Sequence, residues 1–141
     1  GAFRLQVKPG VFAKAPMLWI HGDADDYAPM APCKDYAERI GQAGTPVEFL
    51  VLPGASHKFD DDVRRLFIRG AQRSLPSCPI EVDIDTLYAY DRGTGQRLQG
   101  PAYQETLKSC SALGAHVEGN RAARDQAGAA ATAFLTKVLK P

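Results

Sequence analysis

The chain has 141 residues, 45% of them hydrophobic and 23% charged, and its formal net charge is +1. This composition is typical of a single folded domain and excludes an intrinsically disordered chain. Lys and Arg are scattered, so no basic patch indicates binding to nucleic acid or to a membrane surface, and no apolar run approaches the roughly 18–20 residues of a bilayer-spanning helix. We therefore expect a small-molecule partner and no cofactor.

The first predicted elements form a strand–helix–strand unit over residues 16–52. Residues 17–22, MLWIHG, are a short apolar run ended by glycine, which predicts a strand buried on both faces. An amphipathic helix should follow, because apolar side chains recur there with helical spacing. These side chains are Cys33, Tyr36, Ala37 and Ile40. Residues 47–52, VEFLVL, then predict a second apolar strand.

The two strands of such a unit should be parallel and joined by a right-handed crossover. Both strands then end at the same edge of the sheet, so the loops after Gly22 and Leu52 should emerge side by side. This edge is where open α/β sheets bind ligands.

The pattern changes beyond residue 60. Residues 61–75, DDVRRLFIRGAQRSL, predict a helix whose inward side includes Val63, Leu66, Phe67 and Ala71. Its arginines would form an outward stripe, which we interpret as a solvated surface, with a clamp for a carboxylate substrate as the alternative. They are Arg65, Arg69 and Arg73.

Two further elements complete the prediction. Residues 80–99 alternate apolar and polar side chains around the turn-forming sequence DRGTG, which indicates an inserted β-hairpin. Asn120 can cap a C-terminal helix that runs to about Leu139 and carries an alanine-rich face.

The three cysteines match no metal-binding spacing. Buried free thiols are one interpretation, because Cys is among the most buried residue types. A disulfide between Cys78 and Cys110 that leaves Cys33 free is the other, and it would favour an exported protein. The compartment therefore stays open between cytoplasm and export.

The loops after the two strands carry ionisable side chains. Asp25 stands three residues beyond Gly22 and His57 three residues beyond Gly54. A carboxylate beside an imidazole fixes the tautomer of the ring and stabilises the imidazolium that forms when the ring takes a proton. The pair therefore predicts general-base chemistry, with a turn aspartate and an unrelated surface histidine as the alternative.

Other acidic side chains compete for the role of Asp25. Asp23 and Asp26 lie in the same loop, HGDADDYAP, and His21 precedes them. A metal site built from these four residues is less favoured, because zinc sites contain more imidazoles and calcium sites follow a recognisable loop spacing. We expect no metal.

These motifs resemble a known family. The G-x-x-D of HGDADD, the proline that follows, and LPGASHKFD about thirty residues later resemble the last two motifs of the α/β-hydrolase fold, most closely those of the dienelactone hydrolase family. NRAARDQAGAAATAFL is similar to the closing helix of that family. The resemblance covers residues 16–60 well and 118–139 loosely, and residues 74–115 have no counterpart in it.

The resemblance implies a fold class and a set of site residues. Residues 1–141 would be the C-terminal part of a single α/β-hydrolase domain, with parallel strands, a βαβ unit, an insertion at about 74–115 and a C-terminal helix. Asp25 would be the triad acid and His57 the triad base. Tyr27 and Phe59 would line the substrate pocket, whereas Trp19, in the middle of a strand, is predicted to belong to the core.

The nucleophile of such a triad is missing. Neither G-x-S-x-G nor the G-x-C-x-x-G of dienelactone hydrolases occurs in the sequence. Cys33 follows the acid instead of preceding it, and Ser56 is adjacent to His57, so neither is a good substitute. Two parallel strands also cannot cover their own faces and edges. We therefore expect an N-terminal part of the same protein, or another chain, to complete the sheet.

The leading prediction is a dienelactone hydrolase-like hydrolase of an ester or lactone. Its nucleophile, Ser or Cys, would lie upstream of this chain, and the chain by itself would be inactive. The alternative is a non-catalytic α/β binding or interaction module that uses its open sheet edge or its hairpin.

Overall fold

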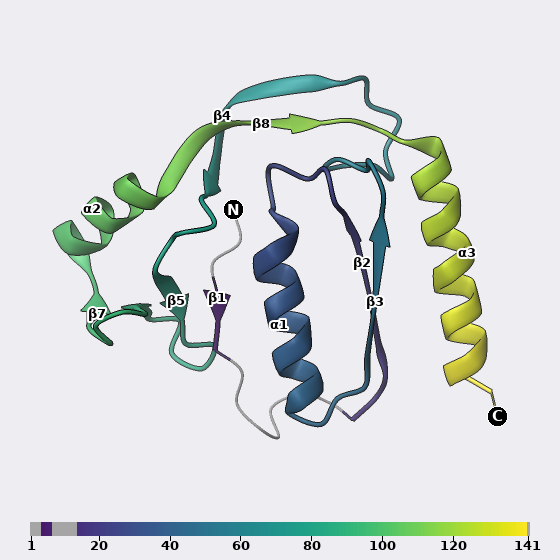
Figure 1. Ribbon diagram of the computed structural model, residues 1–141, viewed down its shortest axis with the longest axis horizontal. Helices are drawn as coiled ribbons and strands as arrows, with labels where there is room; N and C mark the ends of the chain where they lie inside the picture. The colour runs from purple at the N-terminus through teal and green to yellow at the C-terminus, as the bar shows by residue number, and fades with distance from the viewer. Residues whose placement is uncertain (1–3, 7–13, 141) are drawn as a thin grey trace.

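The strand–helix–strand unit predicted from the sequence is present. The computed structural model describes residues 4–6 and 14–140. In it β2 (Met17–Gly22) and β3 (Val47–Leu52) are parallel, with Gly22 opposite Leu52. α1 (Met30–Gln42) connects them and buries Ala37 and Ile40. The two strands therefore end at the same edge of the sheet, at the top of Figure 1.

Two helices cover the β2–β3 pair from opposite sides, α1 on one side and α3 (Arg121–Val138) on the other (Figure 1). Facing α1, Trp19 stacks on Phe49 with ring centroids 6.2 Å apart and meets the Tyr36 ring edge-on. This contact confirms that Trp19 belongs to the packing between helix and sheet.

The side of the sheet that faces α3 holds a small buried cluster of Leu52, Ala55 and Ala123. Alanine at this position of the helix allows its backbone to approach the strands closely. The Asn120 side chain accepts a hydrogen bond of 3.1 Å from the Ala123 N–H, so the predicted N-cap of this helix is confirmed.

The helix predicted over residues 61–75 is wrong. Residues Leu66–Ser74 form strand β4, which pairs antiparallel with β8 (Ser111–Val117). The register runs from Leu66 opposite Val117 to Ser74 opposite Ser111, with an irregularity between Ile68 and Gln72. We call these two strands, residues 66–74 and 111–117, the β4–β8 arm. The arm passes across the ends of β2 and β3 (Figure 1).

The error has a physical cause. Side chains four residues apart lie on one face of a helix and also on one face of a strand, so the arginine spacing could not distinguish the two. Leu66, Phe67 and Ile68 suit a strand, and Gly70 is unfavourable inside a helix. The long-range partner β8 then decides the outcome, because it satisfies the backbone groups of residues 66–74.

The arginines of this segment do not form one solvated stripe. The Arg73 Nε–H donates a hydrogen bond of 3.0 Å to the Gly114 carbonyl, which ties the two strands of the arm together. Arg65 lies 3.5 Å from Glu118 and is largely exposed, as Arg69 is. Arg73 therefore bonds within the arm, whereas Arg65 and Arg69 lie at the surface.

The far end of the arm carries a separate small unit. β5 (Ile80–Val82), β6 (Ala89–Asp91) and β7 (Arg97–Leu98) form an antiparallel meander, so the predicted hairpin is confirmed. β1 (Arg4–Leu5) adds a parallel strand beside β5. α2 (Gly100–Cys110) then leads back into β8.

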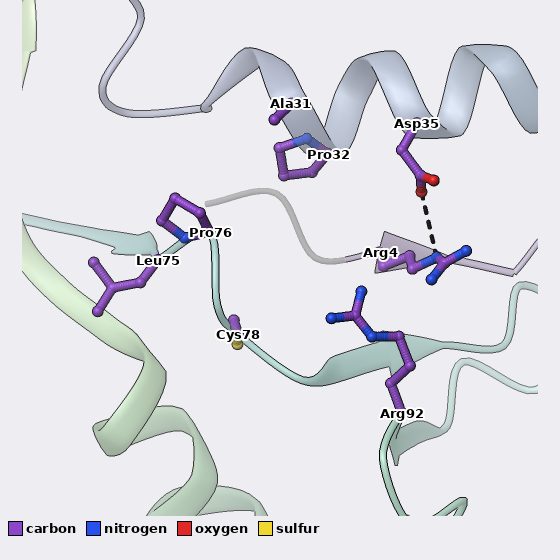
Figure 2. Close-up of a pocket in the computed structure, with 8 residues that line it drawn as sticks. All are labelled: Arg4, Ala31, Pro32, Asp35, Leu75, Pro76, Cys78 and Arg92. Atoms are coloured by element: carbon purple, nitrogen blue, oxygen red, sulfur yellow. Dashed lines mark ion pairs between the residues drawn. The ribbon is translucent and has the colours of Figure 1, made fainter.

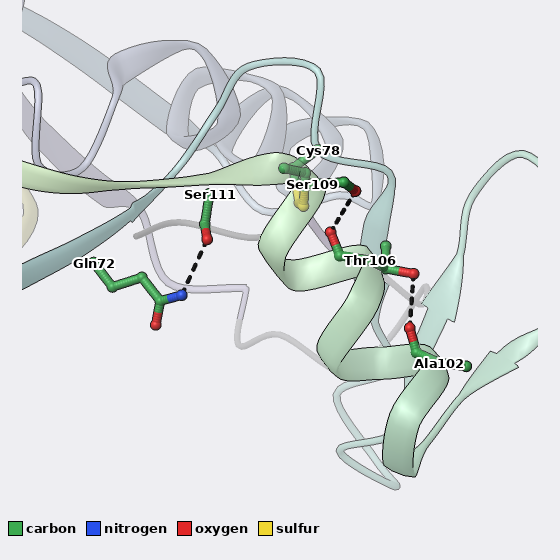
Figure 3. The surroundings of a disulfide bond; sticks show 7 residues. Gln72, Cys78, Ala102, Thr106, Ser109 and Ser111 are labelled. Atoms are coloured by element: carbon green, nitrogen blue, oxygen red, sulfur yellow. Dashed lines mark hydrogen bonds between the residues drawn. A yellow bond between two sulfur atoms is a disulfide. The ribbon is translucent and has the colours of Figure 1, made fainter.

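A disulfide between Cys78 and Cys110 joins the two chain segments that connect this unit to the arm (Figure 3). The Leu75 N–H also donates to the Cys110 carbonyl over 2.8 Å. Cys33 is a free thiol. The segment between Ser74 and Ser111, inside the range 74–115 expected as an insertion, contains β5, β6, β7 and α2, while the arm strands extend to residues 66 and 117.

Within residues 4–6 and 14–140 no helix combines the length and the apolar character that crossing a membrane requires.

We predict that Gly22→Ala destabilises the fold. A Cβ at position 22 would lie 2.1 Å from the Ala55 carbonyl oxygen, a backbone atom of the neighbouring loop that has no rotamer by which to move away. The free energy of unfolding in urea should fall by roughly 1–3 kcal/mol or more. Gly41→Ala is the matched control, because it lies in α1 with nothing within 4 Å and should be neutral or slightly stabilising. Equal effects at the two positions would contradict the close approach.

We also predict that the double variant Cys78→Ser/Cys110→Ser loses roughly 3–4 kcal/mol of stability, the chain-entropy value for a loop with a sequence separation of 32. The measurement is denaturant unfolding without reductant. Cys33→Ser breaks no covalent link and should cost much less. A double variant with the same free energy of unfolding as the parent would show that the disulfide does not stabilise the fold.

Candidate active site

The structure brings Asp25 and His57 together at the edge where β2 and β3 end. The Asp25 Oδ2 lies 2.9 Å from the His57 Nδ1, which is hydrogen-bonding distance. The Asp25 side chain is 9% exposed and the His57 side chain 35% exposed. A buried carboxylate therefore supports an imidazole that reaches solvent.

Asp25 is itself held by its own loop. Its second oxygen, Oδ1, accepts the backbone N–H groups of Tyr27 at 2.9 Å and Ala28 at 2.8 Å. Aspartate commonly forms such turns, because its short side chain reaches the N–H groups two or three residues ahead. These two bonds fix one oxygen and aim the other at His57.

We call residues 23–29, after β2, the acid loop and residues 53–60, after β3, the histidine loop. The two loops are also joined to each other directly. The Asp23 Oδ1 accepts a 2.7 Å hydrogen bond from the Gly54 N–H, and the Ala24 N–H donates to the Ala55 carbonyl over 3.1 Å. Of the two aspartates that compete with Asp25, Asp23 thus contacts the backbone of the opposite loop. Asp26 contacts another histidine, described below.

The turn that carries His57 has an unusual backbone. Gly54 has φ +69°, which glycine adopts without steric cost, and Lys58 has φ +65°, a left-handed conformation that is uncommon for a side chain of this type. The His57 carbonyl accepts the Glu118 N–H at 3.0 Å, and His57 forms an isolated parallel bridge with Val117. The end of β8 therefore supports this turn.

The geometry suits proton transfer. With Nδ1 donating its proton to Asp25, the Nε2 of a neutral His57 is an acceptor and can take a proton from a reacting group. Asp25 would stabilise the imidazolium that results, without being protonated itself. The pair can thus act as a general base and then as a general acid.

The two residues expected in a substrate pocket lie in different surroundings. The Tyr27 ring meets the His57 imidazole edge-on with centroids 4.7 Å apart, so it borders the Asp25–His57 pair, which we call the dyad. Phe59 is partly buried and packs against the buried cluster of Leu52, Ala55 and Ala123. Tyr27 is therefore the better candidate of the two for substrate contact.

Sequence reasoning missed His116. It lies on β8 opposite Phe67, and its Nδ1 is 2.8 Å from the Asp26 Oδ2. The two residues are 90 positions apart, and no spacing rule connects them. The only available signal was that His116 is one of three histidines in the chain and interrupts the apolar run SALGAHV.

Neither Cys33 nor Ser56 has the character of an activated nucleophile. Burial, together with the negative charge of Asp25, raises the pKa of the Cys33 thiol, so its reactive thiolate is disfavoured. Ser56 is 8% exposed and lies beside His57 in the chain. Neither side chain is therefore a good candidate to complete a triad with Asp25 and His57.

The acid loop does not form a metal centre. Its ionisable side chains bond different partners, and the His21 Nε2 lies 2.9 Å from the Ala28 carbonyl. Across the described part of the chain, no three His, Cys, Asp or Glu side chains gather in a group that could hold a metal ion.

A cavity of about 240 Å³ lies elsewhere, between α1 and the unit at the end of the arm (Figure 2). Arg4 and Arg92 both border it, and Asp35 neutralises Arg4 over 3.3 Å. Its lining includes neither the acid loop nor the histidine loop, so it is separate from the dyad.

The Asp26 carboxylate gives a prediction about pH. Partial burial would raise the pKa of Asp26, but hydrogen bonds from the His116 side chain and backbone, aided by the charges of His116 and Arg73, leave it below the ordinary 3.8. Because the pKa is lowered in the folded state, the carboxylate stabilises that state above pH 3.8, and this contribution is lost as the pH falls below 3.8 through the lowered value.

The measurement is the difference in unfolding free energy between the parent and Asp26→Asn. We expect a difference that is constant near neutral pH and shrinks below pH 3.8. A difference that persists unchanged to about pH 2 would contradict the bond as the cause of the lowered pKa.

Comparison of the chain with protein-family models, with curated proteins and with solved structures finds no match. The geometry of the Asp25–His57 dyad is therefore the observation from which a function has to be inferred.

Proposed function

We propose that this chain supplies the acid and the base of a catalytic triad that hydrolyses an ester or a lactone, in the manner of the dienelactone hydrolases. The observation that carries the proposal is the 2.9 Å contact between the Asp25 Oδ2 and the His57 Nδ1 at the ends of two parallel strands. The order along the chain, acid before histidine, is that of the last two triad members in the α/β-hydrolase fold.

The proposed reaction assigns a role to each side chain. The His57 Nε2 takes the proton of a serine or cysteine nucleophile as that group attacks the substrate carbonyl, and Asp25 stabilises the imidazolium. The imidazolium then protonates the leaving alcohol oxygen as the tetrahedral intermediate collapses to an acyl-enzyme. In the second half, His57 deprotonates water, and the attack of hydroxide releases the carboxylic acid and restores the nucleophile.

The nucleophile and the oxyanion hole come from elsewhere in this proposal. Among the described residues β2 and β3 form a two-stranded sheet, whereas parallel sheets are normally wider and covered. Next to this sheet a groove of about 390 Å³ runs between the strands and α3, with Leu18, Phe134 and a Glu48–Lys137 ion pair along it. An N-terminal part of the same protein, or another chain, that extends the sheet would bring the missing groups to the dyad.

We predict that His57→Ala and Asp25→Asn abolish most of the hydrolytic activity of the full-length gene product. Removal of the base leaves the nucleophile protonated, and the amide that Asp25→Asn introduces favours the wrong tautomer of His57. By comparison with other triads, kcat on an aryl ester should fall by roughly 10⁴-fold. The exposed helix residue Glu105 offers a control, because Glu105→Ala should leave kcat unchanged. Hydrolysis that survives in His57→Ala would remove His57 from the mechanism.

The β4–β8 arm favours a second candidate function, that of an interaction module. Leu66 is 55% exposed, Phe67 54% and Leu113 70%, and exposed apolar strands of this kind commonly bind other chains. The two functions differ in one measurable result. A module that only binds would lack esterase activity in the full-length product, and His57→Ala would then have no effect on binding.

A further inference from the structure

Asp26 follows Asp25 directly, yet it bonds the other histidine of this region. Its Oδ2 lies 2.8 Å from the His116 Nδ1, and its Oδ1 accepts the His116 backbone N–H, also at 2.8 Å. Both oxygens of one carboxylate thus bind one residue, which restrains the side chain in distance and in orientation. This double contact joins the acid loop to β8.

The histidine loop is joined to the end of β8 and to the residues that follow it. The Glu118 N–H donates to the His57 carbonyl over 3.0 Å, and the Asn120 N–H donates to the Phe59 carbonyl over 2.9 Å. Val117, between these donors and His116, forms the bridge with His57. Residues 116–120 therefore contact both loops, the acid loop through the side chain and the backbone of His116 and the histidine loop through backbone groups.

The consequence concerns the geometry of the dyad. Asp25 is adjacent to Asp26, and His57 is bonded to the residues that follow His116, so the position of β8 sets both ends of the 2.9 Å contact. A small displacement of a catalytic group lowers rates strongly, because proton transfer needs close and aligned partners. The Asp26–His116 contact thus adds a restraint on the acid loop to the bonds that Asp23 and Ala24 make with the histidine loop.

Charge supports the same interpretation. Two adjacent carboxylates repel each other, and each here has a separate imidazole as its partner. Arg73, whose Nε–H bonds the Gly114 carbonyl in the arm, adds a positive charge that favours the ionised form of Asp26. The Phe67 ring packs on the His116 imidazole with centroids 4.9 Å apart and restrains it from the other side.

We propose that His116 is a positioning residue: through Asp26 it holds the acid loop so that Asp25 stays aimed at the His57 Nδ1. Its effect on catalysis rests on the proposed function, whereas its effect on the imidazole of His57 does not. Both Asp26 and His116 are more than a third exposed, so their contact should contribute more to the orientation of the loop than to the stability of the fold.

The test is to observe the ring nitrogens of His57 in the full chain by long-range ¹H–¹⁵N NMR. In the parent, His57 should be mainly the tautomer with its proton on Nδ1, because that nitrogen donates to Asp25. His116→Ala removes the imidazole contact to the Asp26 Oδ2 and keeps the backbone bond to Oδ1, so the acid loop loses one of its restraints and the Nε2-protonated tautomer should appear alongside. His116→Asn keeps an amide N–H near the place of Nδ1 and should restore the parent spectrum.

Two further variants make the result decisive. Asp26→Ala removes both carboxylate oxygens that bond His116 and should reproduce the change seen in His116→Ala, which keeps the test valid if one variant fails to fold. Arg65→Ala is the matched control, because it removes an exposed side-chain contact just beyond the arm, the one to the Glu118 carboxylate, and should leave the His57 signals unchanged. Unchanged His57 signals in folded His116→Ala or Asp26→Ala would overturn the proposal.

Kinetics separate this proposal from the proposed function. If the full-length product is an esterase, His116→Ala should lower kcat roughly 10- to 100-fold at nearly constant KM, and His116→Asn should recover most of it. An esterase whose kcat is unaffected by His116→Ala would overturn the positioning role alone. A product without esterase activity in which the His57 tautomer still responds to His116→Ala would overturn the proposed function and support the positioning role.

Discussion

The parallel pairing of β2 and β3 is the constraint on which the candidate site depends. Because Gly22 lies opposite Leu52, the loops that follow the two strands begin at the same level and leave the sheet side by side. The absence of a side chain at Gly22 allows the Ala55 carbonyl to approach, and the Ala24 N–H then bonds that carbonyl. Asp25 and His57, 32 positions apart in the sequence, are thereby brought within hydrogen-bonding distance of each other.

The cluster of three aspartates in the acid loop is explained by what each carboxylate bonds. Asp23 accepts from the backbone of the histidine loop, Asp25 from its own loop and from His57, and Asp26 from β8. Three negative charges within four positions would repel one another if they were left unpaired. Each carboxylate bonds a group outside its own loop, Asp23 and Asp25 in the histidine loop and Asp26 in β8, so the charges that destabilise the isolated loop attach it to the rest of the folded protein.

The β4–β8 arm links the candidate site to the disulfide-bonded unit. One end of β8 follows directly on Cys110, and the other end carries His116 and the donors that hold the His57 turn. The segment between Ser74 and Ser111 supplies neither member of the dyad, yet the strand that follows it carries His116 and Val117, which contact the acid loop and the histidine loop. A change in the arm can therefore affect the dyad without touching either of its members.

Local sequence patterns were sufficient for the elements whose partners are near in the chain. The apolar runs of β2 and β3, the helical spacing of α1, the Asn120 cap and the turn between β6 and β7 each depend on contacts within a few residues or within one βαβ unit. The spacing of Asp25 and His57 behind their glycines belongs to the same class. Parallel strands bring such loops together wherever they form, so the contact could be expected from the sequence.

Tertiary structure alone decided the rest. Residues 66–74 form a strand because β8, about forty residues later, satisfies their backbone groups, and no pattern within the segment specifies that partner. The choice of Asp26 as the partner of His116 likewise depends on where β8 crosses the strand ends, 90 residues from the aspartate. The sequence by itself thus determined the dyad, because its geometry follows from local periodicity and chain order. Only the folded chain determined what holds the dyad in place, because that depends on a strand whose position is set by long-range pairing.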